Sequence, residues 1–398
     1  MAKSNYMTTI SIDTNNSLFH FYSMVGNDKK TIRHRRKSYA AKKLDENFFY
    51  KFNAALKDFS ARTPSESIRK VSIILPDSMV LTDTIRVPTI KGVGQTQKML
   101  DVTLGGLYSN YNDLQISAHI VAQNKQYSTI AIAAVQKKFI SSIYAACSEN
   151  KMLVDTLSFA SASTVTAATV LNPKLKNASY LFLDIKDIYS HFSFVVDGKV
   201  IGFYSLPFGL EFLRSPQVIS EDMLFDHSYA ELTVLNAKER AQSQTLSTMP
   251  TFENVLSDTA AGSEEGGNVS ADQNDSDELS IQKIFFNKTP RNLPKFMRRD
   301  VPDTEDAIAY ENFRIFVKWA LSLIQNNEKI TIIRKPEFVC VNLPSNLAYV
   351  LDMANAESKE NGIMFTRLSV PDDDPIIASS LELYGGQFPS QINPGNKF

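Results

Sequence analysis

Residues 180–209 read YLFLDIKDIYSHFSFVVDGKVIGFYSLPFG, and this stretch decides the fold. Its first four residues are apolar and predict a strand that runs into Asp184. Residues 189–196 and 199–206 predict two further strands, which meet at Asp197-Gly198. That dipeptide favours a two-residue hairpin turn, because the turn needs positive φ at both positions. The stretch therefore predicts a three-stranded meander whose first strand ends in an aspartate.

The first half of the chain shows the same order of elements. Residues 8–13 (TTISID) predict a strand that ends in Asp13. After it the sequence predicts strands at 17–25 and 31–39, a helix at 45–62 and a strand at 71–75. The meander of the second half is followed by a predicted helix at 307–326, a strand at 337–341, a helix at 345–360 and a strand at 363–368. The chain therefore predicts an α/β protein built from a duplicated β-β-β-α-β unit.

Two segments interrupt this duplication. Residues 79–150 predict a compact β-α-β-β-α insertion in the first half, from their alternating strand and helix patterns. Residues 241–282 contain no Lys or Arg and are rich in acidic and small polar residues. Such a composition cannot bury enough apolar surface to offset the entropy of ordering, so we expect a disordered acidic loop over 241–300.

The composition limits the classes of function. The chain has 398 residues, enough for two or three domains, and its formal net charge is -1. Cys147 and Cys340 have no neighbouring Cys or His, which excludes a disulfide scaffold and a CxxC-type metal site. No Walker A, HExxH, GxSxG or dinucleotide-binding fingerprint occurs, and the N-terminus has no secretory signal pattern. We therefore expect a protein of the reducing cytoplasm without a metal site.

The duplicated unit with an aspartate at the end of each first strand resembles the actin-like (ribonuclease-H-like) ATPase fold. The insertion resembles that of the branch formed by FtsA and the type IV pilus assembly protein PilM. Four stretches look like PilM-type sequences: VLTDTIRVP (80–88), TIAIAAVQKKFISSIYAACSENKMLVDTLSFASAS (129–163), the stretch at 180–209 and IAYENFRIFVKWALSLIQ (308–325). The resemblance implies a first actin-like subdomain at 1–78 plus 151–177, the insertion at 79–150 and a second half at 178–240 plus 301–374, with 375–398 packing back on the first subdomain.

The nucleotide loops that this resemblance implies are degenerate. The family has Asp-x-Gly in the first phosphate loop, Asp-x-Gly-x-Gly-Thr-Thr in the second and Gly-Gly-Gly-Ser at the adenosine strand. Glycines belong there because the backbone must approach the phosphates closely. This chain instead has Asp13-Thr14-Asn15, Asp184-Ile185-Lys186-Asp187-Ile188-Tyr189-Ser190 and Asn342-Leu343-Pro344-Ser345. The candidate remnant of a nucleotide site is therefore Asp13, Asn15, Asp184, Lys186, Ser190, Asn342 and Ser345.

Two interpretations of these residues stay open. Asp13 and Asp184 either bind their own turn amides or retain a magnesium–nucleotide complex. Lys186 either replaces a magnesium charge near a phosphate or pairs with Asp13, Asp184 or Asp187 in a closed cleft. We expect the closed cleft, hence no catalytic residue and no cofactor, with ATP and magnesium as the alternative. The five histidines have no ligand spacing, and His20 and His191 are expected as sheet residues.

A basic stretch is the strongest local charge feature. It comprises Lys29, Lys30, Arg33, Arg35, Arg36 and Lys37. Positive charge on an outer strand prevents edge-to-edge pairing, and it also attracts anionic lipid head groups. Nucleic acid is the least favoured partner, because almost no aromatic residue is interleaved for stacking.

The resemblance implies a cytoplasmic scaffold, peripheral at the inner face of the cytoplasmic membrane, in a type IV pilus-like assembly. Its expected partner is the N-terminal cytoplasmic tail of a single-span, PilN-like inner-membrane protein, with other machine components or a second copy as further partners. We expect the tail in a groove between the first subdomain and the insertion, floored by Val87, Pro88, Met99 and Leu100. Two alternatives remain: an active actin-like ATPase that polymerises or switches with nucleotide, and a membrane-surface or nucleic-acid adaptor using residues 29–43.

Overall fold

The computed structural model describes residues 7–13, 18–25, 31–38, 46–62, 70–89, 95–108, 110–187, 189–206, 209–214, 304–325, 336–358, 363–370, 377 and 380–398. The predicted acidic loop, together with Asn15, Lys29 and Lys30, lies outside the described residues. Among those described, no helix is both long and apolar enough to cross a membrane.

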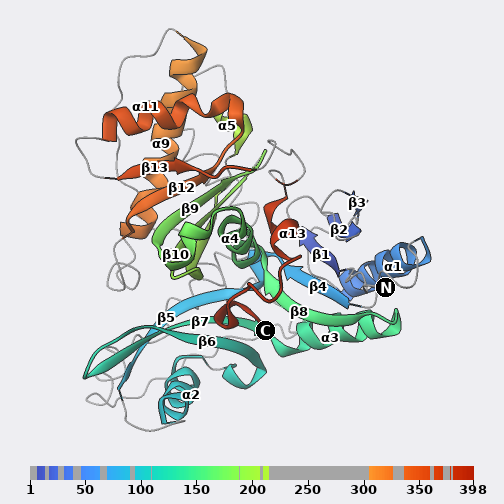
Figure 1. The fold of residues 1–398 in the computed structure, drawn as a ribbon. Coiled ribbons are helices and arrows are strands. Elements are labelled where there is room, and N and C mark those ends of the chain that lie inside the picture. Colours follow the sequence, from blue (N-terminus) through green and yellow to red (C-terminus); the bar gives the residue numbers. More distant parts are fainter. Residues whose placement is uncertain are drawn as a thin grey trace, which may run out of the picture.

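Two five-stranded sheets of identical topology form the two halves of the molecule (Figure 1). The first contains β1 (Met7–Asp13), β2 (Leu18–Val25), β3 (Thr31–Ser38), β4 (Lys70–Leu75) and β8 (Leu153–Phe159) in the order β3-β2-β1-β4-β8. The second contains β9 (Ser179–Ile185), β10 (Ser190–Val196), β11 (Lys199–Leu206), β12 (Phe338–Asn342) and β13 (Met364–Arg367) in the order β11-β10-β9-β12-β13. In each sheet the meander is antiparallel and the last two strands are parallel. This repeated order confirms the predicted duplicated actin-like fold.

The hairpin between β10 and β11 forms as the sequence predicts. Asp197 has φ 50° and Gly198 has φ 69°, so both central residues adopt the left-handed conformation. A side chain at position 198 would also crowd the carbonyl oxygen of Lys176, 3.2 Å from an added Cβ. Glycine is therefore required there for conformation and for space.

Aromatic packing fixes α1 (Glu46–Ala61) on the first sheet. Phe48, Phe52 and Phe59 are buried, and the ring of Phe19 on β2 lies 5.6 Å from that of Phe48 and 5.3 Å from that of Phe52. Each fully buried phenylalanine stabilises the fold by about 1.5–3 kcal/mol relative to an exposed one. The helical spacing of these residues is the feature that predicted α1.

The insertion has its own three-stranded antiparallel sheet, in the order β5-β7-β6. It consists of β5 (Leu81–Pro88), α2 (Gln95–Leu107), β6 (Leu114–Gln123), β7 (Tyr127–Gln136) and α3 (Lys137–Glu149), the predicted β-α-β-β-α order. The helix α2 covers one face of this sheet with Leu100 and Leu104. The helix α3 instead packs against α1, and its Phe139 and Ile143 belong to the core of the first half. The second helix of the insertion is thus a structural part of the first half.

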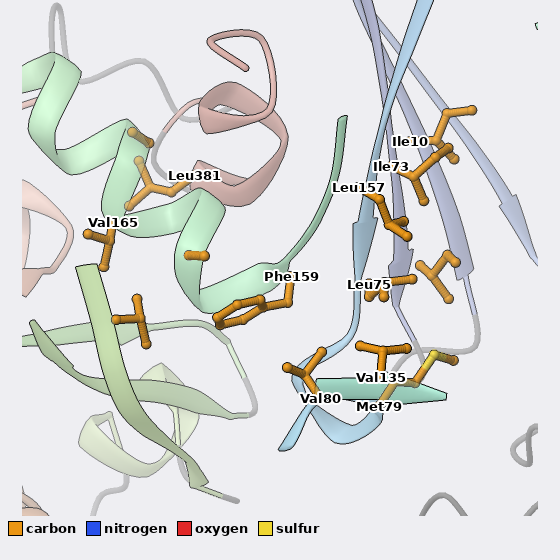
Figure 2. Packing of buried hydrophobic residues seen from close by; sticks show 14 of the residues in the cluster. Ile10, Ile73, Leu75, Met79, Val80, Val135, Leu157, Phe159, Val165 and Leu381 are labelled. Carbon is orange, nitrogen blue, oxygen red and sulfur yellow. The ribbon is translucent and has the colours of Figure 1, made fainter. Parts of the chain in front are cut away.

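The two halves are joined by α4 (Ala160–Leu171), which follows β8 and leads through η4 (Pro173–Asn177) into β9. Its sequence ASASTVTAATVL is rich in small residues, and residues 160–168 are all buried. Figure 2 shows the core that reaches this helix: Ile10, Ile73 and Leu157 lie on the first sheet, Phe159 lies at the start of α4, and Leu381 lies close to the same helix. Small side chains on α4 allow neighbouring elements to approach it closely.

The remaining elements complete the second half and return the chain to the first. They are η2 (Asp77–Met79), η3 (Tyr111–Asp113), α5 (Leu210–Leu213), α9 (Glu305–Gln325), η6 (Ser345–Leu347), α11 (Tyr349–Ser358), α13 (Leu381–Gly385) and η8 (Pro394–Asn396). The helices α9 and α11 pack together in the second half, whereas α13 packs against α4, β1 and β2. The C-terminal region therefore lies against the first half and the connecting helix.

Candidate functional site

The candidate site lies where the strands of both sheets end in polar residues. Asp13 is the last residue of β1, and Asp184 lies on β9 directly opposite Asn342 of β12. Asp184 is completely buried, and its Oδ1 accepts a 2.7 Å hydrogen bond from Nδ2 of Asn342. Asn342 stands where the resemblance implies the first glycine of the adenosine loop. Its side chain thus binds Asp184, the aspartate of the second candidate loop.

Lys186 is the central cation of this site. Its Nζ lies 3.1 Å from Oδ2 of Asp184 and 2.9 Å from Oε2 of Glu382 on α13, and the side chain is only 9% exposed. Burial alone would lower the pKa of Lys186, but the adjacent Asp184 and Glu382 outweigh it and raise this pKa. Conversely, burial opposes ionisation of Glu382, and Lys186 overcomes this to hold its pKa below the ordinary value. Of the two interpretations of Lys186, the structure contains the pairing with Asp184. No sequence pattern predicted Glu382 as a second partner of Lys186.

Tyr189 stands at the start of the β9–β10 hairpin and interacts electrostatically with Lys186, Asp184 and Glu382. Burial raises the pKa of its phenol well above the ordinary value, and the neighbouring Asp13 and Glu382 raise it further. The phenol is therefore neutral at physiological pH. Its electrostatic neighbours come from β1 of the first half and from α13, so this side chain lies between the halves.

The loop between β9 and β10 is held by backbone hydrogen bonds. The Lys186 amide donates to the Tyr189 carbonyl at 2.9 Å, and the Leu210 and Glu211 amides donate to the Lys186 and Asp187 carbonyls at 2.8 and 2.9 Å. Gly209 makes this approach feasible, since an added Cβ would lie 2.3 Å from the Lys186 oxygen. Amides of α5 therefore bind two carbonyls of the loop and fix it in place.

A second buried cluster links the halves through Asp77 of η2. One carboxyl oxygen, Oδ1, accepts from the Ser161 amide at 2.9 Å, while Oδ2 lies 2.9 Å from Nδ1 of His191 and accepts from Oγ of Ser161 at 2.5 Å. Burial would lower the pKa of His191, but Asp77 more than compensates and raises it. His191 is therefore one partner of a bond between the second sheet and the first half, in addition to being the sheet residue that the sequence predicted.

A third contact occurs within the first half. Nε2 of His20 lies 3.3 Å from Oδ2 of Asp13, and both side chains are largely buried. His20 lies on β2 opposite Ser11, two residues before Asp13, whereas His191 lies on β10 directly opposite Asp184. The two halves thus repeat a histidine beside their terminal aspartates but use it for different contacts.

The chemistry of these clusters is that of salt bridges and hydrogen bonds. In the Asp77 cluster the carboxylate lies between the serine and the histidine, so the histidine is not placed to take the serine proton. Burial raises the pKa of the Cys147 and Cys340 thiols to about 12, so neither is a nucleophile at neutral pH. Within the described ranges, no group of three His, Cys, Asp or Glu side chains converges on a metal position.

Other predicted site residues lie in different surroundings. Ser190 is completely buried in β10, whereas Ser345 is exposed at the start of η6 and contributes nothing to the buried clusters. Of the basic stretch, Arg33, Arg35, Arg36 and Lys37 lie on β3, the outer strand of the first sheet, as edge protection requires.

The predicted groove floor is wrong for two residues. Val87 is fully buried and Leu100 is 2% exposed, because both pack between the insertion sheet and α2. Pro88 is exposed at the end of β5 and Met99 is partly buried on α2. The sequence could not separate core from surface here, because the insertion has the same apolar residue types in its core and on its exposed positions.

No family model matches the sequence, and no curated protein is similar to it. Among solved structures, the PilM-PilN type IV pilus biogenesis complex aligns with 96% of this chain and 98% of its own chain, at 12% identity and a TM-score of 0.49. The cytoplasmic domain of EpsL, an inner-membrane component of the type II secretion system of Vibrio cholerae, aligns over 51% of this chain and 71% of its own at 10% identity and a TM-score of 0.35. The ethanolamine utilization protein EutJ from Carboxydothermus hydrogenoformans aligns over 95% of this chain and 88% of its own at 9% identity and a TM-score of 0.34. The strand order and pairing of the two sheets, rather than these superpositions, establish that the chain has a duplicated actin-like fold.

Proposed function

We propose that this chain is a cytoplasmic scaffold of a type IV pilus-like, envelope-spanning assembly, with an actin-like cleft that no longer binds ATP. The observation that carries the proposal is the buried contact of Lys186 with Asp184 and Glu382. This contact lies at the end of β9, where the resemblance would place the second phosphate loop.

Steric and electrostatic reasons both oppose a nucleotide in this cleft. A phosphate beside Asp184 would have to compete with the side chains of Lys186 and Glu382, which are already paired there. Separating Lys186 from its partners would leave buried charges unpaired, which costs about 3–5 kcal/mol for a buried pair. The Lys186 amide is also already bound to the Tyr189 carbonyl, and α5 holds the Lys186 and Asp187 carbonyls of the same loop.

The scaffold role is supported by the insertion and by the sequence resemblance to PilM-type proteins. The insertion sheet has its own core, and its described side chains form no group of three His, Cys, Asp or Glu that could hold a metal ion. It presents apolar side chains outward, including Val102, which is 71% exposed on α2, and Tyr127, which is 50% exposed on β7. These two exposed side chains are the contacts that we propose for a protein partner. The resemblance supplies the class of that partner, the cytoplasmic tail of a PilN-like inner-membrane protein, and with it a peripheral location at the membrane.

Calorimetric titration of the full-length protein with magnesium–ATP tests the closed cleft. We expect no saturable binding up to millimolar nucleotide and no change in Tm, since a ligand that binds only the folded state would raise it. Micromolar affinity together with an ATP-dependent rise in Tm would overturn the proposal in favour of an active actin-like ATPase.

The partner is tested with the cytoplasmic N-terminal peptide of a single-span, PilN-like inner-membrane protein. We expect Val102→Asp and Tyr127→Asp to weaken its binding at least tenfold, because each places a charge on the apolar surface of the insertion. Tyr50→Asp is the matched control, since Tyr50 is 76% exposed on α1 of the first half. Equal binding by all these variants would remove the insertion from the interface, and no binding by the wild type would contradict the scaffold role.

A further inference from the structure

The C-terminal residues 393–398 lie across a junction of three elements from different parts of the chain. These are β11, an outer strand of the second sheet, β8, an outer strand of the first sheet, and β6 of the insertion. Figure 1 shows the C-terminus beside β7 and β8. The short helix η8 packs against β6, β7 and β11.

Asn396 binds the edge of β11 in the manner of a neighbouring strand. Its Oδ1 accepts from the Val200 amide at 3.1 Å, and its Nδ2 donates to the Val200 carbonyl at 3.2 Å. The side chain belongs to a residue that is only 3% exposed, so water does not compete for these bonds. Asn393 adds a 2.6 Å hydrogen bond from its Nδ2 to the Gly198 carbonyl in the adjacent turn.

The same segment binds the edge of β8 through its main chain. The Phe398 amide donates to the Leu157 carbonyl at 3.0 Å, and the Asn396 carbonyl accepts from Oγ of Ser158 at 2.8 Å. The ring of Phe398 lies 6.2 Å from that of Phe159. The segment thus bonds to the outer strands of both sheets.

Gly395 supplies the contact with the insertion. A Cβ atom added there would lie 1.9 Å from Nδ1 of His119 on β6, so only glycine fits without displacing that ring. The junction therefore distinguishes side chains at three positions of the segment: an amide at 396, no side chain at 395 and an aromatic ring at 398.

We propose that this junction is a recognition site for a short peptide of the form Asn-x-Gly-Asn-x-Phe, occupied in cis by residues 393–398. The contacts are those of peptide recognition at sheet edges, in which main-chain hydrogen bonds give affinity and a few side chains give specificity. Because the bound segment bridges both sheets and the insertion, it clasps these three parts together. The site does not depend on the proposed function, since none of its residues lies in the cleft.

Hydrogen exchange of full-length variants tests the clasp. Asn396→Ala removes the side-chain acceptor of the Val200 amide and the side-chain donor to the Val200 carbonyl. We expect hydrogen exchange of the Val200 amide to accelerate roughly tenfold or more. Gly395→Ala should do the same through a clash on the opposite side of the segment. Gln391→Ala is the control, because that side chain is exposed, and it should leave exchange at Val200 unchanged. Unchanged exchange in both clasp variants would overturn the proposal.

A labelled peptide of sequence QINPGNKF, residues 391–398, tests whether the site accepts this segment in trans. We expect it to bind the full-length Asn396→Ala protein at least tenfold more tightly than the wild type, whose own segment competes at high effective concentration. The peptide carrying alanine for Asn396 should bind neither protein. If the two peptides bind equally, or neither binds a folded variant, the site is not a recognition site. Should Asn396→Ala fail to fold, Asn393→Ala takes its place, because it removes a bond to the Gly198 carbonyl from the segment and leaves the receiving strands intact.

Discussion

Gly385 of α13 lies directly on the backbone of Ser163 in α4, and a Cβ atom at position 385 would lie 1.8 Å from the Ser163 carbonyl oxygen. Ser163 also donates from Oγ to the Glu382 carbonyl at 2.6 Å. This close crossing brings α13 near enough for the Glu382 side chain to reach Lys186. The filling of the cleft therefore depends on the small residues of the connecting helix as well as on the phosphate loops.

We expect Gly385→Ala to destabilise the protein by about 1–3 kcal/mol, because the added methyl group meets a backbone atom that cannot move independently. Urea unfolding would measure the loss. Gly106→Ala is the matched control. Gly106 lies on α2, an added Cβ there would meet no neighbouring side chain or element within 4 Å, and alanine favours helix. Equal stability of the two variants would show that α13 does not pack as described.

Removal of Lys186 is expected to cost more stability than removal of Glu382. Lys186→Met leaves Asp184 and Glu382 buried without their shared cation, at a cost of about 3–5 kcal/mol, whereas Glu382→Gln leaves Lys186 paired with Asp184. A double-mutant cycle measured by denaturant unfolding should give a coupling clearly above zero. Lys70→Met is the control, since its pair with Asp155 is largely exposed and should contribute little. Additive effects of Lys186→Met and Glu382→Gln would contradict the buried pair.

The bond between Asp77 and His191 predicts a specific dependence of stability on pH. Since the pKa of His191 is raised on folding, the folded state holds this proton more tightly than the unfolded chain. The contribution of this proton to the free energy of unfolding is complete below the ordinary histidine pKa of about 6.5. It is lost as pH rises through the raised pKa of His191 in the folded state. Unfolding free energies of wild type and His191→Gln should therefore differ most at mildly acidic pH and converge at alkaline pH.

His119 provides a control, because its pKa is shifted in the opposite direction and its effect on the pH dependence of stability is therefore reversed. Burial, assisted by Lys199, lowers its pKa to about 4, so the folded state disfavours the protonated form. Stability should fall as pH decreases from about 6.5 towards 4, and His119→Gln should remove this loss.

A difference between wild type and His191→Gln that grows at alkaline pH would exclude the bond to Asp77 as its cause.

Local patterns predicted the fold, whereas the site depends on contacts that are remote in the chain. Asp197-Gly198 specified the hairpin, and the sequence also marked Asp184, which contacts Lys186 and Asn342. Glu382 reaches Lys186 across 196 residues of sequence separation, and no residue near it marks this role. Helical periodicity likewise predicted α3 but did not reveal that its apolar face packs on α1 instead of the insertion sheet.

Restoring glycine at the second phosphate loop should not restore nucleotide binding. Lys186→Gly with Ile188→Gly reopens the loop sequence, but it also removes the cation that compensates Asp184 and Glu382. The carboxyl groups that remain would repel the phosphates, and Asn342 with the following Leu343-Pro344 still replaces the glycines of the adenosine loop. We therefore expect a protein with a lower Tm and no calorimetric signal for magnesium–ATP. Lys125→Gly, in the exposed turn between β6 and β7, controls for the loss of a lysine and should leave Tm nearly unchanged. Saturable ATP binding by the double-glycine variant would mean that the second loop alone blocks the cleft, and that the adenosine side is still competent.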